Sequence, residues 1–417
     1  MPQVPRFRLR TRMVARDVNE EDRVSSPLEL LFDLTFVVAV AQLSTQFALQ
    51  VEHGDGVAKI LPLIMVFFAI WWAWINFTWF ASAYDADDIA YRLLTLVQMA
   101  GVLVLAAGVP SALNSSNFLG ITIGYFIMRV GLVAQWTRAG IENPDGRATA
   151  LRYAAGITIV QLGWLVRLLL PTTPDLVPYT VYLAFFILLV FEMSVPAWAE
   201  RKGKTSWHAG HIAERYGLFT IILLGEAVAS LATGVGLILG SNRPTAGLIV
   251  VGVASLVLVF TMWWIYFLQP AGEGLDERRN SSYLWGYGHY FVFLSLAGLA
   301  SGLDVVIAGA GGELELPVLA AAYAIAIPVA VYLFSLWLVH VPVVPERIVG
   351  IEAVLPYSIA ILLLPLAAPA LGLPATFVLI VVVAILSVAT VMLIKQRRLA
   401  REGQASGDSG ERKPAQQ

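Results

Sequence analysis

The chain has 417 residues, of which 58% are hydrophobic and only 13% are charged, and its formal net charge is −2. Ordinary soluble domains carry about 25% charged residues, so this composition excludes that class. The absence of cysteine excludes disulfides, thiolate metal sites and cysteine nucleophiles. Apolar runs of about 20 residues recur along the chain, and each can cross roughly 30 Å of hydrocarbon. We therefore expect an all-α polytopic membrane protein.

The first 26 residues form a basic arm with six arginines between Arg6 and Arg23. An arginine-rich leader peptide is the competing interpretation. Acidic residues from Asp17 to Asp22, and the lack of a small-residue cleavage site after a short apolar core, favour an arm that is retained. We expect this arm to lie in the cytoplasm.

Twelve apolar runs follow the arm, and each is expected to form one membrane span. They cover about 27–50, 58–84, 89–111, 117–138, 148–170, 176–198, 208–238, 245–268, 281–308, 315–341, 347–370 and 373–395. Arginine and lysine concentrate in the loops after even-numbered spans, and the opposite loops offer little beyond Lys59 and Arg243. Because basic residues favour the cytoplasmic side, we expect a multi-pass cell (inner) membrane protein with both termini in the cytoplasm.

The first span opens with "ELLFDLTF", which places Glu29 and Asp33 one turn apart on one helix face. Ser25 or Ser26 can cap this helix, and Pro27 suits its first turn. A charge near the bilayer centre costs about 2.5–3.5 kcal/mol, so both acids are candidate substrate- or ion-binding residues. The alternative is that an acid at the helix start only complements the helix dipole.

Polar and aromatic residues in the next spans suggest a cavity wall and a charge network. Trp72 and Asn76 are candidate substrate-binding residues, although membrane-belt or packing roles are the alternative. A network that gates the cytoplasmic side, or that only fixes helix packing, is expected from charged residues in spans 2 to 6. These residues are Asp85, Asp88, Arg92, Arg129 and Glu192.

The seventh span carries two further candidate sites. His208, His211 and Glu214 are spaced three apart and form a possible metal-binding face, whereas a solvated helix start is the alternative. Glu226 lies twelve residues beyond Glu214, about 18 Å along a helix, and so well inside the membrane. His289 in the ninth span is either a substrate-binding residue or a structural histidine.

Three segments recur in the same order about 192 to 197 residues apart. The segments "LLFDLTFVVAV", "WWAWINF" and "LLTLVQMAGVLVLAAGV" correspond to "LLGEAVASLAT", "MWWIYF" and "HYFVFLSLAGLASGL". We expect two parallel six-helix halves, 27–204 and 205–395. A disordered cytoplasmic tail is expected over 396–417, since that stretch is rich in Gly, Ser, Gln and charges.

"SPLELLFDLTFVVAVAQLS" and "ERYGLFTIILLGEAV" resemble the bacterial low temperature requirement protein A family. "YDADDIAYRLLTLVQMAGVLVLA" and "YGHYFVFLSLAGLASGL" continue the likeness, which covers roughly residues 23 to 395. The resemblance implies a polytopic membrane protein of a family named after a cold-growth phenotype, and it implies no particular activity.

An ion- or proton-coupled transporter or permease of a small solute is the leading hypothesis, with Asp33 and Glu226 as carriers. Its partners would be the lipid bilayer and a small molecule or ion. The chain has no phosphate-binding glycine loop, nucleophile elbow or nucleic-acid module, so we expect no nucleotide cofactor and no nucleic acid. The rival hypothesis is a membrane-embedded enzyme with a divalent metal that acts on a lipid or apolar metabolite. A receptor or scaffold is the third class.

Overall fold

The computed structural model describes residues 10–18, 20, 23–171, 173, 175–240, 246–268, 271–312, 317–343 and 351–411. Helices and their connections make up this part of the chain, and no β-strand occurs in it. The chain divides into two compact units, Met1–Ile222 and Leu223–Gln417. This boundary, after residue 222, lies within a helix, whereas we expected the division between residues 204 and 205.

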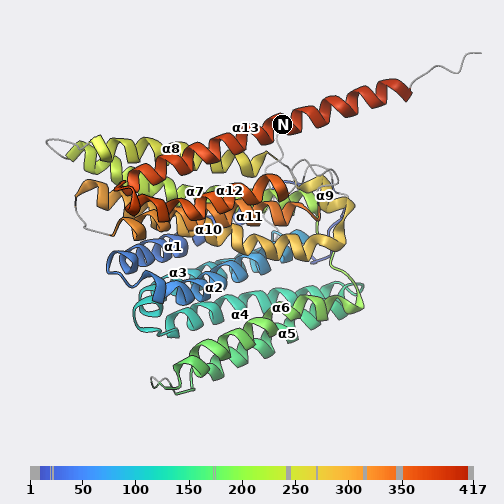
Figure 1. Ribbon diagram of the computed structural model, residues 1–417. Coiled ribbons are helices and arrows are strands. Elements are labelled where there is room, and N and C mark those ends of the chain that lie inside the picture. Colours follow the sequence, from blue (N-terminus) through green and yellow to red (C-terminus); the bar gives the residue numbers. More distant parts are fainter. Residues whose placement is uncertain are drawn as a thin grey trace, which may run out of the picture. The chain divides into compact units, whose positions relative to one another are not determined.

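The first unit is a bundle of long helices in up-and-down order (Figure 1). It contains α1 (Pro27–Glu52), α2 (Gly56–Ala83), α3 (Ile89–Ser115), α4 (Leu119–Glu142), α5 (Arg147–Arg167), the π-helical turn η1 (Pro178–Leu183), α6 (Ala184–Ala199), the 3₁₀ turn η2 (Glu200–Lys202) and the first part of α7 (Ala209–Gly240). Helix α2 is the most buried of its spans, and Trp71, Trp72 and Trp74 are all 1% exposed or less. These tryptophans therefore pack inside the bundle and form no belt at its surface.

Helix α1 begins where the sequence predicted, and its start fixes a carboxylate. Ser26 is the N-cap, and its hydroxyl accepts a hydrogen bond from the Glu29 backbone N–H at 3.3 Å. In return, the Glu29 carboxylate accepts one from the Ser26 N–H at 2.8 Å, and Pro27 occupies the first turn. This capping box holds the Glu29 side chain against the helix end.

Helices α3 and α4 approach each other through glycine. A Cβ atom on Gly124 would lie 2.3 Å from the Leu105 backbone nitrogen, and one on Gly108 would lie 2.6 Å from the Ile121 nitrogen. Small residues allow membrane helices to pack backbone against backbone, where van der Waals contact replaces the hydrophobic effect. The backbones of α3 and α4 are therefore closely packed against each other.

The second unit consists of the rest of α7 and the helices that follow it. These are α8 (Ala246–Phe267), the short α9 (Gly272–Glu277), the 3₁₀ turn η3 (Arg279–Ser281), α10 (Ser282–Gly311), α11 (Val318–His340), α12 (Ile351–Ala370) and α13 (Ala375–Glu411). Helix α11 packs against α10 and α12, and α8 packs against α13.

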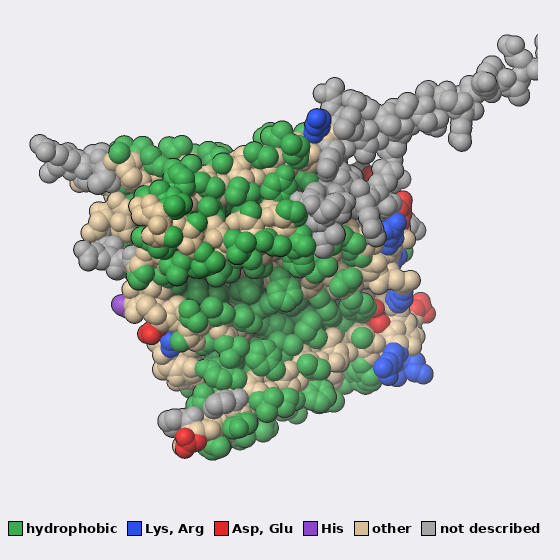
Figure 2. All heavy atoms as spheres, viewed as in Figure 1, with side chains coloured by type: hydrophobic (Ala, Val, Ile, Leu, Met, Phe, Trp, Pro, Cys, Tyr) green, Lys and Arg blue, Asp and Glu red, His purple; other side chains and the backbone are tan. Residues whose placement is uncertain are grey.

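The helices confirm the polytopic membrane class. Among the described residues, eleven helices are long and apolar enough to cross a bilayer, and α12 adds a shorter apolar helix over Val354–Ala370. Each of the twelve expected spans contains a helix, and the ends are shifted by a few residues except at the C-terminal end of α13. Large apolar side chains such as Leu34 and Phe260 remain more than half exposed, as lipid-facing residues do. Figure 2 shows the helix flanks covered by hydrophobic side chains, with charged side chains at the helix ends.

The C-terminal tail differs from our expectation. Helix α13 continues to Glu411, so residues 396–411 are helical rather than disordered, and residues 412–417 lie outside the described part.

Candidate functional site

Two acids and an arginine form a fully buried ionic cluster in the first unit. Arg215 of α7 donates to both carboxylate oxygens of Asp33, at 2.9 and 2.5 Å, and to Glu29 at 2.9 Å. Trp74 of α2 donates from its indole nitrogen to Asp33 at 2.8 Å. None of these four side chains is more than 1% exposed. The one-turn spacing of the acids thus lets one guanidinium bind both of them.

His211 completes this acid–arginine cluster. Its Nε2 atom lies 3.1 Å from Glu29 Oε1, within ion-pair distance but without hydrogen-bond alignment. The imidazole is 0% exposed, and its Nδ1 atom has no hydrogen-bond partner among the described residues. Two carboxylates therefore meet one permanent cation and one group that changes charge with a single proton.

The expected metal face is wrong, because its three side chains have other partners. His208 accepts the His211 backbone N–H on Nδ1 at 3.1 Å and so caps α7, while Glu214 accepts the Ser25 N–H at 3.2 Å. Within the described ranges, no group of three His, Cys, Asp or Glu side chains is placed to hold a metal ion.

The N-terminal arm lies over the end of the bundle nearest this acid–arginine cluster. The Arg16 N–H donates to the Ala83 carbonyl at 3.0 Å, and its guanidinium donates to Asp85 at 3.3 Å. Arg23 is 8% exposed and donates to the Ala81 carbonyl. Burial and the nearby Glu29 carboxylate raise the pKa of Asp85 to about 6, although Arg23 and Arg16 oppose the rise.

The other expected network residues separate into local pairs. Asp88 caps α3 by accepting the Tyr91 N–H, and it also binds Arg138 and the Thr11 N–H of the arm. Burial alone would raise the pKa of Asp88, but these three hydrogen-bond donors outweigh it and lower the pKa to about 2. Arg92 pairs instead with the exposed Asp87, at 2.8 and 2.9 Å.

Arg129 and Glu192 form a second buried ion pair, deep between α4 and α6. Arg129 donates to Glu192 at 2.6 Å, and each residue is 2% exposed. The Tyr125 hydroxyl also donates to Glu192, at 2.8 Å, and accepts a hydrogen bond from Arg129. Trp164 donates to the other Glu192 oxygen at 3.1 Å. All of these contacts fix the carboxylate within the bundle.

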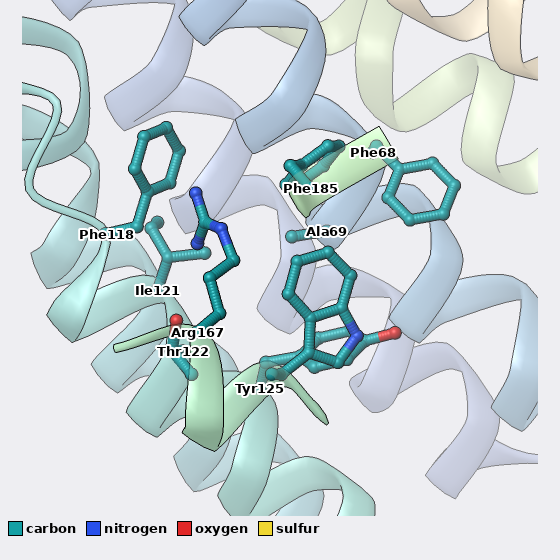
Figure 3. Close-up of a pocket in the computed structure, with 9 residues that line it drawn as sticks. Phe68, Ala69, Phe118, Ile121, Thr122, Tyr125, Arg167 and Phe185 are labelled. Atoms are coloured by element: carbon teal, nitrogen blue, oxygen red, sulfur yellow. The ribbon is translucent and has the colours of Figure 1, made fainter. Parts of the chain in front are cut away.

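A pocket lies beside this ion pair, at the bundle end opposite the arm. Figure 3 shows Arg167 extending into it between Phe118 and Phe185, and Tyr125 also lines it. Between these side chains the free space is about 20 Å³, roughly enough for one water molecule. A wider hollow of about 520 Å³ adjoins it, and Phe118 and Arg167 line both.

Trp72 and Asn76 do not line this pocket. Trp72 stacks on Phe68 with ring centroids 5.8 Å apart, and the Asn76 amide donates to the Trp72 carbonyl of its own helix at 2.7 Å. Both residues therefore have local packing contacts in α2.

The second unit holds the remaining expected residues. Glu226 is partly exposed on α7 and lies within electrostatic range of Asp304 on α10. His289 is fully buried, with Nδ1 2.7 Å from the Trp285 carbonyl and Nε2 3.3 Å from the Tyr266 hydroxyl. A neutral His289 satisfies both contacts if Nδ1 carries the proton, which fits a structural histidine.

Comparison with known proteins identifies the family. The family model for the bacterial low temperature requirement A protein (LtrA) matches residues 24–391. The chain belongs to the LtrA family. It is also similar to an uncharacterised protein of Rhizobium meliloti (strain 1021), with 29% identity over 316 residues, which are 72% of this chain and 73% of that protein. No solved structure matches the chain. The family resemblance seen in the sequence motifs is confirmed.

Three arginines of this LtrA chain were missed as site residues from the sequence. They are Arg138, Arg167 and Arg215. A signal existed for Arg215, since it lies one residue beyond Glu214 in a segment that becomes apolar at Leu218. Its partners lie 182 and 186 residues away, and no local pattern identifies them.

Proposed function

We propose that this LtrA-family membrane protein moves a small solute across the cell membrane together with a proton or another cation. The charge imbalance of the acid–arginine cluster carries the proposal. Among the side chains in direct contact, Glu29 and Asp33 supply two negative charges and Arg215 supplies one positive charge, all of them buried. Arg16 and Arg23 act on Glu29 only at longer range. Charged groups kept inside membrane helices mark ion and proton pathways by default.

The imbalance explains why such a cluster would take up a cation. A buried net charge is costly, so uptake of one proton brings the cluster close to neutrality. His211 is the acceptor in this proposal, because its Nε2 atom lies 3.1 Å from the Glu29 carboxylate, whose negative charge would stabilise the protonated imidazole. Proton release would restore the net negative charge and favour a different arrangement of α1 against the start of α7.

Glu226 is a third carboxylate in this proposal. It sits on the membrane helix α7 beside small residues, and Asp304 adds a second acid nearby. We expect it to act as a further proton or cation carrier, at the position of the proposed repeat that corresponds to Asp33.

The test uses proteoliposomes with an imposed pH gradient and a panel of labelled small solutes. Asp33→Asn and Glu29→Gln each leave Arg215 with one carboxylate, so the altered cluster is neutral without an added proton. Both variants should fold, and each should lose gradient-driven uptake, as should Glu226→Gln. Asp87→Asn is the matched control, since Asp87 is exposed at the same bundle end and has φ of 41°, which Asn tolerates.

Growth at low temperature in a strain without its own family member gives a second measurement that does not require the solute. If Asp33→Asn, Glu29→Gln and Glu226→Gln all support uptake and growth as the unaltered protein does, the coupled-transporter proposal is wrong.

A further inference from the structure

Arg167 is a buried cation whose hydrogen bonds are incomplete. It is 7% exposed, and one guanidinium nitrogen donates to the Val181 carbonyl at 2.8 Å. In the part of the chain that the structure describes, its Nε atom has no hydrogen-bond partner, and no ion pair includes it. Arg129 and Arg215, which are 2% and 0% exposed, each bind a carboxylate. Arg23, at 8% exposed, also donates to a backbone carbonyl, but the carboxylates of Glu29 and Asp85 lie within electrostatic range of it.

Aromatic rings provide the rest of its surroundings. The guanidinium carbon lies 5.1 Å from the Phe118 ring centroid and 5.8 Å from those of Trp164 and Phe185. Contacts of this kind attract a cation, but each is individually weak. They leave the guanidinium without an anion in a place where unpaired charge is costly.

The hollow beside Arg167 is large enough for a small organic molecule. Its volume of about 520 Å³ falls within the range of ligand sites, and its lining combines apolar residues with Ser115, Asn117 and Thr180. The π-helical turn η1 forms one wall and supplies the Val181 carbonyl that orients Arg167. Such turns are frequent at functional sites.

We propose that Arg167 and this hollow bind a small organic anion with a carboxylate head and an apolar, preferably aromatic, body. The planar guanidinium matches a carboxylate with two parallel hydrogen bonds. The body of the ligand would lie against Phe118 and the apolar lining of the hollow. A cationic ligand is disfavoured, because the nearest buried acid, Glu192, already accepts from Arg129, Tyr125 and Trp164.

This inference rests on the proposed function in one respect, which is that the bound anion is taken to be the transported solute. Binding itself needs no transport, no gradient and no change at Asp33. Failure of uptake with intact binding would therefore count against the proposed function alone, whereas loss of binding counts against the site.

The experiment is isothermal titration calorimetry on the full-length protein in a neutral detergent. The probes are phenylacetate, indole-3-acetate, benzoate and octanoate, each compared with its uncharged amide. At least one acid should bind at least about tenfold more tightly than its amide, as a charge-assisted bidentate contact predicts. Arg167→Gln should abolish this preference, and Phe118→Leu should weaken binding of the aromatic acids more than that of octanoate.

Arg152→Gln is the matched control, because Arg152 lies on the same helix with its guanidinium 5.6 Å from the Trp198 ring centroid. It should leave binding unchanged. Arg167→Gln should fold, because it removes an unpaired buried charge, and melting temperature checks this. If it fails to fold, Arg167→Lys and Phe118→Leu carry the test.

Several results would overturn the proposal. The first is equal affinity for acids and amides. The second is that no acid binds with a dissociation constant below about 10 mM. The third is a preference for acids that persists in Arg167→Gln. In nanodiscs, a requirement of Arg167 for phosphatidylglycerol binding without any carboxylate binding would make the hollow a lipid site instead.

Discussion

At the residue scale, the buried acids of α1 depend on a partner from α7. Arg215 is the guanidinium that Asp33 and Glu29 share, so its loss would leave two carboxylates in an apolar interior. Removal of one partner of a buried ion pair costs roughly 3–5 kcal/mol, whereas replacement of all the charges by neutral groups is often tolerated. The cluster is therefore fragile to single changes and tolerant of combined ones.

We predict that Arg215→Met lowers the stability of the protein by about 3–5 kcal/mol. Asp33→Asn and Glu29→Gln combined with Arg215→Met should restore most of it, because no buried charge remains. Thermal unfolding in detergent, followed by circular dichroism, measures both effects. A single Arg215→Met variant as stable as the unaltered protein would contradict the buried-charge argument.

Asp85 and Asp88 should give opposite dependences of stability on pH. The pKa of Asp85 is raised from 3.8 to about 6 in the folded protein, so its contribution is present below about pH 4 and is lost as pH rises through 6. The change amounts to at most about 3 kcal/mol. We predict that Asp85→Asn removes this loss of melting temperature between pH 4 and 7.

Asp88 is the comparison for that measurement. Its pKa is lowered from 3.8 to about 2, so its contribution is present above about pH 4 and disappears as the pH falls towards 2. Asp88→Asn should therefore flatten the acid side of the stability profile and leave the pH 4 to 7 side unchanged. The reverse pattern in the two variants would show that these pKa shifts are assigned wrongly.

At the scale of elements, the close contact of α3 and α4 leaves no room for side chains. A Cβ atom at Gly124 would lie 2.3 Å from backbone of α3, so the two helices would have to separate. We predict that Gly124→Ala destabilises the protein by roughly 1–3 kcal/mol, as overpacked sites do. Gly225→Ala is the control, since a Cβ atom there meets nothing within 4 Å and alanine favours the helix. Equal melting temperatures for both variants would contradict this account.

Helices were the part of the fold that the sequence predicted well. Apolar runs, the Ser26–Pro27 start and the loop positions are local properties, so each expected span contains a helix. Pairing across helices could not be predicted. Asp88 binds Arg138, and Asp33 binds Arg215, because tertiary packing decides which side chains meet. The expected metal face has a local explanation instead, since His208 caps its own helix.

At the scale of the whole molecule, hydrogen bonds of the first unit place two distant segments at one end of the bundle. Arg16 of the arm donates to Ala83, and the His208 N–H donates to the Ser82 hydroxyl at 3.0 Å. An even number of spans therefore separates the arm from the start of α7. Basic residues gather at this end, and the opposite end of the unit has Lys59 and Arg167. The basic set at the arm's end is Arg10, Arg12, Arg16, Arg23, Arg92, Arg138, Arg147, Arg201, Lys202 and Lys204.

This asymmetry predicts the orientation of the protein. Positively charged loops remain in the cytoplasm during insertion, so the end that carries the arm should face inward and the Arg167 hollow should face outward. We predict that reporter fusions after Thr205 and after Arg401 both show cytoplasmic activity, because six and then twelve spans precede them. A fusion after Asn117, between α3 and α4, is the control and should report the outer side. A non-cytoplasmic signal after Thr205 would reverse the first unit. One after Arg401 alone would mean that α12, which is not among the eleven long apolar helices, does not cross the membrane.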